Sequence, residues 1–168
     1  MSQQILGSRS HSDRLEIDPR GPQFAAALTA AVLGAVLLLA PSALATGLLA
    51  VQAALFALGA GLGVTRTPHA WLFRRVVGPR LAPPSHREDA APPRFAQGVG
   101  LAFAVVGLVG FVAGVTWLGL VATGLALAAA LLNAVFGFCL GCEIYLLAAR
   151  AGLPSIVRRT AQTTRRTA

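Results

Sequence analysis

Residues 24–64 read FAAALTAAVLGAVLLLAPSALATGLLAVQAALFALGAGLGV and contain no charged side chain. The hydrocarbon core of a bilayer is about 30 Å thick and takes roughly 20 helical residues, so this stretch is too long for one span. Pro41 lies near its middle, where a proline removes a backbone N–H donor and favours a break. The sequence therefore predicts two membrane-spanning helices, at about 23–40 and 44–63, joined by a tight turn.

A second charge-free run extends over residues 95–142 and ends at Glu143. Trp117 lies inside it, and tryptophan favours the membrane–water interface. We therefore expect the turn of a second hairpin at Trp117 and two further spans at about 97–115 and 120–147.

The composition agrees with a membrane protein. Of the 168 residues, 55% are hydrophobic and 12% are charged, whereas about a quarter of a soluble domain is charged. The predicted fold class is all-α, a polytopic protein with four transmembrane helices in two hairpins. A secretory signal peptide is the competing interpretation of the first span, because 43–45 has the small-x-small look of a cleavage site. The apolar run is long for a signal, however, and continues directly into another span.

The distribution of arginine predicts the orientation. We expect a polar N-terminal tail at 1–22, a transmembrane domain at 23–148 containing a connector at 64–96, and a basic C-terminal tail at 149–168. These three polar segments hold all fourteen basic residues, every one an arginine, and the two predicted turns hold none. The positive-inside rule then places both termini in the cytoplasm. The net charge of +8 is thus read as a topological signal and not as a nucleic-acid footprint. The absence of lysine and the abundance of glycine and alanine suggest a G+C-rich bacterial genome, and therefore the bacterial plasma membrane.

Small residues should provide the contacts between helices, because there is little hydrophobic drive for association within lipid. Three pairs of glycines have the small-xxx-small spacing and are expected to be contact surfaces: Gly59 with Gly63, Gly110 with Gly114, and Gly137 with Gly141.

The two halves of the chain also resemble each other. Pro22-Gln-Phe-Ala25 opens the first predicted hairpin and Pro93-Arg-Phe-Ala96 opens the second. Both hairpins would start from the cytoplasm, so a duplication would be parallel and not inverted. Between the hairpins, Thr67-Pro68 predicts a helix start, and residues 69–77 suit a short helix in the headgroup layer.

One segment carries chemistry, Gly137-Phe-Cys-Leu-Gly-Cys-Glu143. Helical spacing places Cys139, Cys142 and Glu143 on roughly one face near the cytoplasmic end of the last span. A Cys-x-x-Cys pair suggests thiol–disulfide or sulfur-transfer chemistry, with Glu143 as a modulator. The negative end of the helix dipole and the adjacent Glu143 would both keep the thiols protonated. A disulfide would also require local unwinding at Gly141, because a regular helix holds cysteines three apart in poor geometry.

Two other interpretations remain open for the cysteines. Cys139, Cys142 and Glu143 could be metal ligands, with His69 as the fourth, although a four-ligand zinc site normally shows two such pairs and this chain has one. Alternatively, both cysteines are small buried apolar residues without chemistry. The sequence contains no phosphate-binding glycine loop, no His-Glu-x-x-His and no serine elbow, and no cofactor is predicted.

Several motifs resemble the bacterial membrane family called domain of unknown function 4395, in its actinobacterial form. They are Asp18-Pro-Arg-Gly-Pro-Gln-Phe24, Phe73-Arg-Arg75, Pro79-Arg-Leu81, Glu88-Asp-Ala-Ala-Pro-Pro-Arg-Phe-Ala-Gln97 and Gly137-Phe-Cys-Leu-Gly-Cys-Glu143. The resemblance covers about residues 17 to 150 and implies the four-span fold. The family has no established activity. Members encoded near thioredoxin-like and thiosulfate sulfurtransferase proteins imply a sulfur or redox context for the two cysteines.

The leading hypothesis is an accessory protein in thiol redox or sulfur trafficking that is not an enzyme on its own. It would present Cys139 and Cys142 to a cytoplasmic thioredoxin-like or sulfurtransferase partner, with the arginine-rich connector as docking surface. One alternative is a non-catalytic scaffold or assembly subunit in contact with anionic lipid. Another is a small transporter working as a homo-oligomer, which would need a polar cavity at Asn133 and Glu143.

Overall fold

The computed structural model describes residues 16–84 and 86–151, and most of these are helical. Four helices are long and apolar enough to cross a membrane, which confirms the predicted all-α fold class. Their bounds are α2 Arg20–Leu39, α3 Ala43–Leu62, α5 Ala91–Val112 and α6 Thr116–Phe136.

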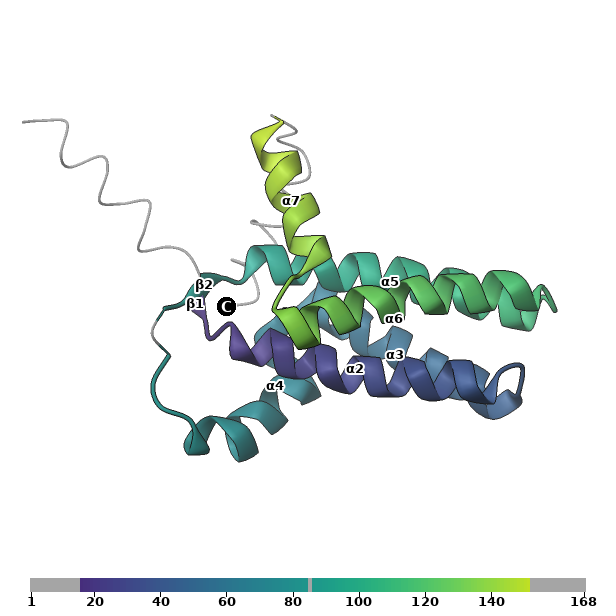
Figure 1. Ribbon diagram of the computed structural model, residues 1–168, viewed down its shortest axis with the longest axis horizontal. Helices are drawn as coiled ribbons and strands as arrows, with labels where there is room; N and C mark the ends of the chain where they lie inside the picture. Colours follow the sequence, from purple (N-terminus) through teal and green to yellow (C-terminus); the bar gives the residue numbers. More distant parts are fainter. Residues whose placement is uncertain (1–15, 85, 152–168) are drawn as a thin grey trace, which may run out of the picture.

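The four long helices form a closed bundle. Helix α2 packs on α3 and α6, and α5 packs on the same two helices, so each helix contacts its own hairpin partner and one helix of the other hairpin. Leu33 and Val36 of α2 meet Leu49 and Phe56 of α3 in a buried core that Ala104 and Ala126 complete. Both hairpin turns lie at the same end of the bundle (Figure 1).

The remaining elements gather at the opposite end (Figure 1). The connector after α3 is largely helical, and a two-stranded antiparallel sheet joins the segments that precede α2 and α5. The bounds of these short elements are β1 Glu16–Ile17, η1 Val64–Arg66, α4 Pro68–Leu72, η2 Phe73–Val77, η3 Gly78–Arg80, β2 Glu88–Asp89 and α7 Leu140–Arg150.

The second hairpin differs from its predicted bounds, whereas α2 and α3 lie close to theirs. Helix α5 begins at Ala91 and not at 97, because prolines are tolerated in the first turn of a helix, where the missing N–H would have no partner. The predicted connector is therefore wrong at its C-terminal limit. The turn after α5 centres on Gly114, whose φ is +75°, so Trp117 belongs to the first turn of α6 and not to the turn.

The predicted single helix at 120–147 is wrong, because the chain forms two helices there. Gly137 adopts a left-handed conformation with φ of +67°, which glycine reaches without steric cost. The N–H groups of Gly137 and Phe138 donate to the carbonyls of Asn133 and Leu132, at 3.0 and 3.3 Å. These bonds close the end of α6, and the separate helix α7 turns away from the bundle axis (Figure 1).

Each predicted glycine pair divides into one contact and one turn. Gly59, Gly110 and Gly141 lie against neighbouring helices closely enough that an added Cβ would clash. Gly63, Gly114 and Gly137 instead have positive φ and end helices or form turns. The prediction that all six glycines are contact surfaces is thus correct for half of them. A substitution at the other three would strain the backbone, whatever space surrounds them.

The sheet and the helix starts show that the two halves share one design. Glu16 pairs with Asp89 and Ile17 with Glu88, which is the pairing that a two-fold axis between the halves would produce. The Asp18 carboxylate accepts from the N–H of Arg20 at 3.0 Å, and the Asp89 carboxylate accepts from the N–H of Ala91 at 2.9 Å.

The predicted repeat motif has matching contacts in both halves. Gln23 of α2 donates from Nε2 to the carbonyl oxygen of Ala134 near the end of α6, at 3.1 Å. Arg94 of α5 donates to the carbonyls of Ala60 and Gly61 at the end of α3. In each case a side chain from the start of one hairpin closes the last turn of the other. These contacts support the parallel duplication predicted from sequence.

Candidate functional site

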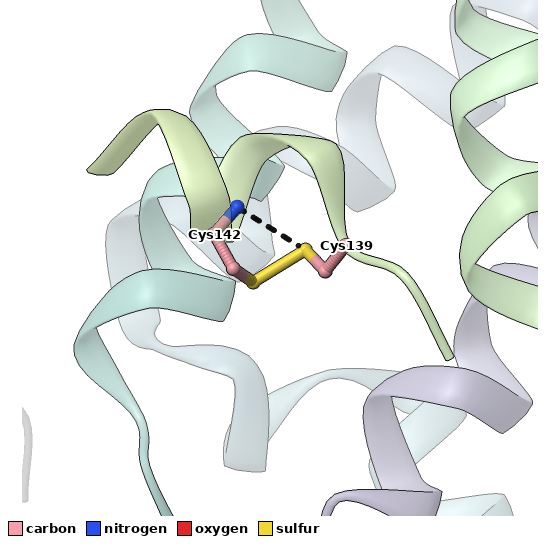
Figure 2. The surroundings of a disulfide bond; sticks show 2 residues. All are labelled: Cys139 and Cys142. Atoms are coloured by element: carbon pink, nitrogen blue, oxygen red, sulfur yellow. Dashed lines mark hydrogen bonds between the residues drawn. A yellow bond between two sulfur atoms is a disulfide. The ribbon is translucent and has the colours of Figure 1, made fainter. Parts of the chain in front are cut away.

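The chemistry available to the Cys-x-x-Cys segment depends on where α7 begins. Cys139 is the residue before the helix, with φ of −86° and ψ of 98°, and its Sγ accepts a hydrogen bond from the N–H of Cys142 at 3.3 Å. Figure 2 shows the sulfur of Cys139 folded back over the first turn toward Cys142. Cys139 is therefore the N-terminal cap of α7.

The two cysteines form a disulfide. Their Cα atoms are 5.2 Å apart, within the range that a disulfide can bridge. Extended backbone at Cys139 makes this possible, because one cysteine lies outside the helix and the other within its first turn. The sequence predicted unwinding at Gly141, but Gly141 is helical and the unwound segment is 137–139.

The electrostatic surroundings are the reverse of those predicted. The cysteines lie at the beginning of a helix and not near the end of one. A helix N-terminus presents unpaired N–H groups and the positive end of the dipole, both of which stabilise a thiolate. Glu143 lies in the same first turn and is exposed to solvent. The expected suppression of thiol chemistry by a negative helix end therefore does not apply.

Contacts with α5 hold this end of α7 in place. A Cβ added to Gly141 would lie 2.6 Å from the Cβ of Ala96, so the two backbones approach as closely as glycine permits. One turn later the ring of Tyr145 packs against Phe95, with 5.7 Å between centroids, and Tyr145 is buried. Both cysteines are half-buried, and α5 supports the helix beside them.

A cavity of about 270 Å³ adjoins the disulfide. Residues of α2, α3, α5, α6 and α7 line it, and Cys139 forms part of its wall. The lining is mainly apolar, with Thr29, Gln97 and Asn133 as its polar side chains. Glu143 is not among the lining residues, so the polar cavity that the transporter hypothesis requires has only Asn133 of its two predicted residues.

The four residues considered as metal ligands are not gathered together. Among residues 16–84 and 86–151, no group of three His, Cys, Asp or Glu side chains could hold a metal ion. His69 lines a different cavity, of about 220 Å³, together with Asp18 and Thr67. Burial lowers the pKa of His69 below 6.5. In the same region the side-chain hydrogen bond from Arg20 lowers the pKa of Asp18 below 3.8.

Sequence reasoning missed the role of Arg94. It was counted as one of the basic residues that mark the cytoplasmic side, yet its side chain is only 3% exposed and closes the end of α3. Guanidinium groups suit this position because they donate several hydrogen bonds and carry positive charge toward the negative end of a helix. The signal that could have revealed it is its alignment with Gln23 in the repeat, where a neutral donor serves the same purpose.

The match to a family model extends over residues 17–150. The chain belongs to the family described as domain of unknown function (DUF4395). The DUF4395 match includes both hairpins, the connector and α7 to its last residue. Comparisons with curated proteins and with solved structures found no match.

Proposed function

We propose that the chain is an integral plasma-membrane protein whose Cys139–Cys142 pair exchanges electrons with a cytoplasmic thioredoxin-like or sulfurtransferase partner. The observation that carries the proposal is the half-buried disulfide at the capped start of α7. A helix N-terminus favours the thiolate that such exchange requires. The alternative of passive, buried cysteines is less consistent with sulfurs that are linked to each other and partly exposed.

The proposed orientation of the protein in the membrane follows from the positions of its arginines. The described arginines lie in or beside the elements at the end of the bundle that holds β1, β2, α4 and α7, and the two hairpin turns have none. By the positive-inside rule this end faces the cytoplasm. The reactive pair and the basic connector would therefore be available to the same soluble partner.

The connector offers a docking surface beside the bundle. Arg74 and Arg75 are exposed, and the guanidinium of Arg75 lies 6.0 Å from the ring centroid of Trp71, which is also exposed. Arginine and tryptophan are enriched at protein interfaces. An acidic rim around the active cysteines of a partner would be complementary to this surface.

The exchange balances without an external oxidant. A thiolate of the partner attacks one sulfur of the Cys139–Cys142 disulfide, and the other sulfur leaves as a thiolate. The second thiol of the partner then displaces the attached cysteine. The partner becomes a disulfide, and Cys139 and Cys142 take up the two electrons and two protons.

The test is a thiol mass-tag experiment on the full chain in membrane vesicles. Vesicles are treated with a reduced thioredoxin, with oxidant or with polysulfide, and free thiols are then counted by the mass of the tagged protein. We expect two thiols after reduction and none after oxidation. Cysteines that stay free under both oxidant and polysulfide would contradict the proposal. Cys139→Ser and Cys142→Ser should each leave one thiol that oxidation cannot close into a disulfide within the chain.

A scaffold without chemistry is the second candidate, and one observation favours it. The close approach of Gly141 to Ala96 shows that the Cys-x-x-Cys segment also fixes α7 on the bundle. If that is its whole purpose, the Cys139→Ser/Cys142→Ser double variant should assemble and support growth like the parent chain. Loss of function with intact assembly would favour the redox proposal.

A further inference from the structure

We propose that the cavity beside Cys139 binds the ring of a lipid-soluble quinone, which oxidises the reduced cysteine pair. The inference rests on the proposed redox function and adds the electron acceptor to it. A pair that is reduced by a soluble partner must pass its electrons on before it can act again. The wall of the cavity includes Cys139, so an occupant would lie next to one residue of the pair that it has to oxidise.

The size and lining of the cavity fit such a ring. An apolar cavity of about 150 Å³ is enough to hold benzene, and this one has about 270 Å³. Phe56 and Phe103 contribute aromatic surface, against which a planar ring can stack. A hydrophobic, ring-bearing molecule is therefore favoured over a soluble, charged electron acceptor.

Two amides in the lining suit the carbonyl oxygens of a quinone. Gln97 of α5 and Asn133 of α6 both line the cavity. No hydrogen bond engages either amide among residues 16–84 and 86–151, and the Gln97 side chain lies against Gly59 of α3. Because each amide carries two N–H donors, the pair can orient a ring that has an acceptor on opposite sides.

The cavity also reaches the outer surface of the bundle. Its lining runs from Phe56, which is 7% exposed, to Leu125 in α6 and Ile144 in α7, which are 54% and 43% exposed. In a membrane the exposed face of α6 would contact lipid, so a quinone could enter laterally from the bilayer.

The oxidation of the cysteine pair and the reduction of the quinone balance each other. The thiolates of Cys139 and Cys142 form a disulfide and release two electrons, and the quinone takes these electrons with two protons to become a hydroquinone. No further oxidant is needed.

The experiment uses the full chain in lipid vesicles, reduced and then freed of reductant under anaerobic conditions. Decylubiquinone is added, and both hydroquinone formation and thiol loss are followed. We expect one hydroquinone for each disulfide, with a rate that saturates in quinone. The Cys139→Ser/Cys142→Ser variant should form none.

Ala129→Phe tests the site itself, because Ala129 lines the cavity and the larger ring would fill it. We expect the quinone-driven rate to fall by about tenfold or more, while oxidation by a soluble disulfide reagent changes little. Ala128→Phe is the matched control, since Ala128 is exposed on the same helix and does not line the cavity. It should react like the parent.

The outcomes separate the two proposals. If decylubiquinone does not oxidise a pair that thioredoxin reduces, the quinone inference is overturned and the proposed redox function stands. Equal rates in Ala129→Phe and the parent would also overturn it, because oxidation would then occur outside the cavity. If thioredoxin cannot reduce the disulfide at all, the proposed function fails and the inference fails with it.

Discussion

The short helices that follow the two hairpins begin in the same way but differ in the atom that caps them. Thr67 caps α4 by accepting from the N–H of Ala70 at 3.2 Å, and Cys139 caps α7 by accepting from the N–H of Cys142 at 3.3 Å. An aromatic ring follows each cap, since Phe73 of η2 packs on Phe24 and Tyr145 of α7 packs on Phe95. The first half is therefore a version of the second half without sulfur.

The cavities beside the two caps differ in the polarity of the residues that line them. The one that Thr67 lines also has Asp18, His69 and Arg74 in its wall, whereas the one that Cys139 lines is mainly apolar. The same fold thus has charged residues in the cavity wall of one half and a mainly apolar cavity beside a disulfide in the other. The comparison teaches that the helix cap is structural in both halves and that sulfur is the addition on which the proposed redox role depends.

The largest expected effect comes from breaking the crossed contacts between the hairpins. Arg94→Ala removes the donors to two carbonyls at the end of α3 and should cost about 3 kcal/mol of unfolding free energy, because buried acceptors are left unpaired. Gln23→Ala removes one neutral donor and should cost about 1 kcal/mol. Unfolding in mixed micelles measures both free energies. Equal losses in the two variants would show that a charged donor stabilises the helix end no more than a neutral one.

The next effect concerns the packing of α7. Gly141→Ala would place a Cβ 2.6 Å from the Cβ of Ala96, and overpacking of this kind costs about 2 kcal/mol. We expect α7 to move off α5 and become sensitive to limited proteolysis. Gly34→Ala is the control, because nothing lies within 4 Å of an added Cβ there. A Gly141→Ala variant that resists protease like Gly34→Ala would show that the contact is not restrictive.

A smaller effect is expected from the cap of α4. Thr67→Ala removes a capping acceptor and should cost about 1 kcal/mol, measured as thermal unfolding in detergent. Cys139→Ala should cost more, because it removes the disulfide together with the cap.

The equivalence of the two caps can also be tested by introducing a cysteine pair at the start of α4. Thr67→Cys/Ala70→Cys should form a second disulfide on oxidation, detectable by mass after thiol tagging, because a matching cap hydrogen bond precedes α4. Thiols that remain free would mean that the two helix starts are less alike than their hydrogen bonds suggest.

The smallest effect is a pH dependence of the unfolding free energy, which should arise only from the first half of the chain. Because burial lowers the pKa of His69 below 6.5, the folded chain binds fewer protons there than the unfolded chain. Its contribution to stability is full above pH 6.5 and is lost as the pH falls through the folded pKa. Asp18 in the same cavity has a pKa lowered below 3.8 by its bond from Arg20, so it stays ionised in this range. His69→Gln should flatten the unfolding free energy between pH 7.5 and 5.5, and an unchanged slope would exclude His69 as its source.

The sequence by itself determined the number of spans and their grouping into hairpins. The lengths of the charge-free runs and the positions of arginine set these features. Charged side chains are costly in hydrocarbon, so the segments that can cross a membrane are recognisable from local composition. The repeat of Pro22-Gln-Phe and Pro93-Arg-Phe was likewise visible in the chain, but its crossed contacts were found only in the structure.

Only the tertiary structure decided where the last helix breaks and what the cysteines do there. An uncharged run without proline carries no local signal that forces a break at Gly137, and the break becomes favourable once α7 can pack its Gly141 and Tyr145 on α5. The break turns Cys139 from a helical residue into a cap, brings its sulfur to Cys142 and makes the residue part of the cavity wall. Contacts between residues distant in sequence cannot be read from local pattern. For that reason the sequence predicts the two cysteines near the C-terminal end of a helix, whereas they lie at the N-terminal end of α7.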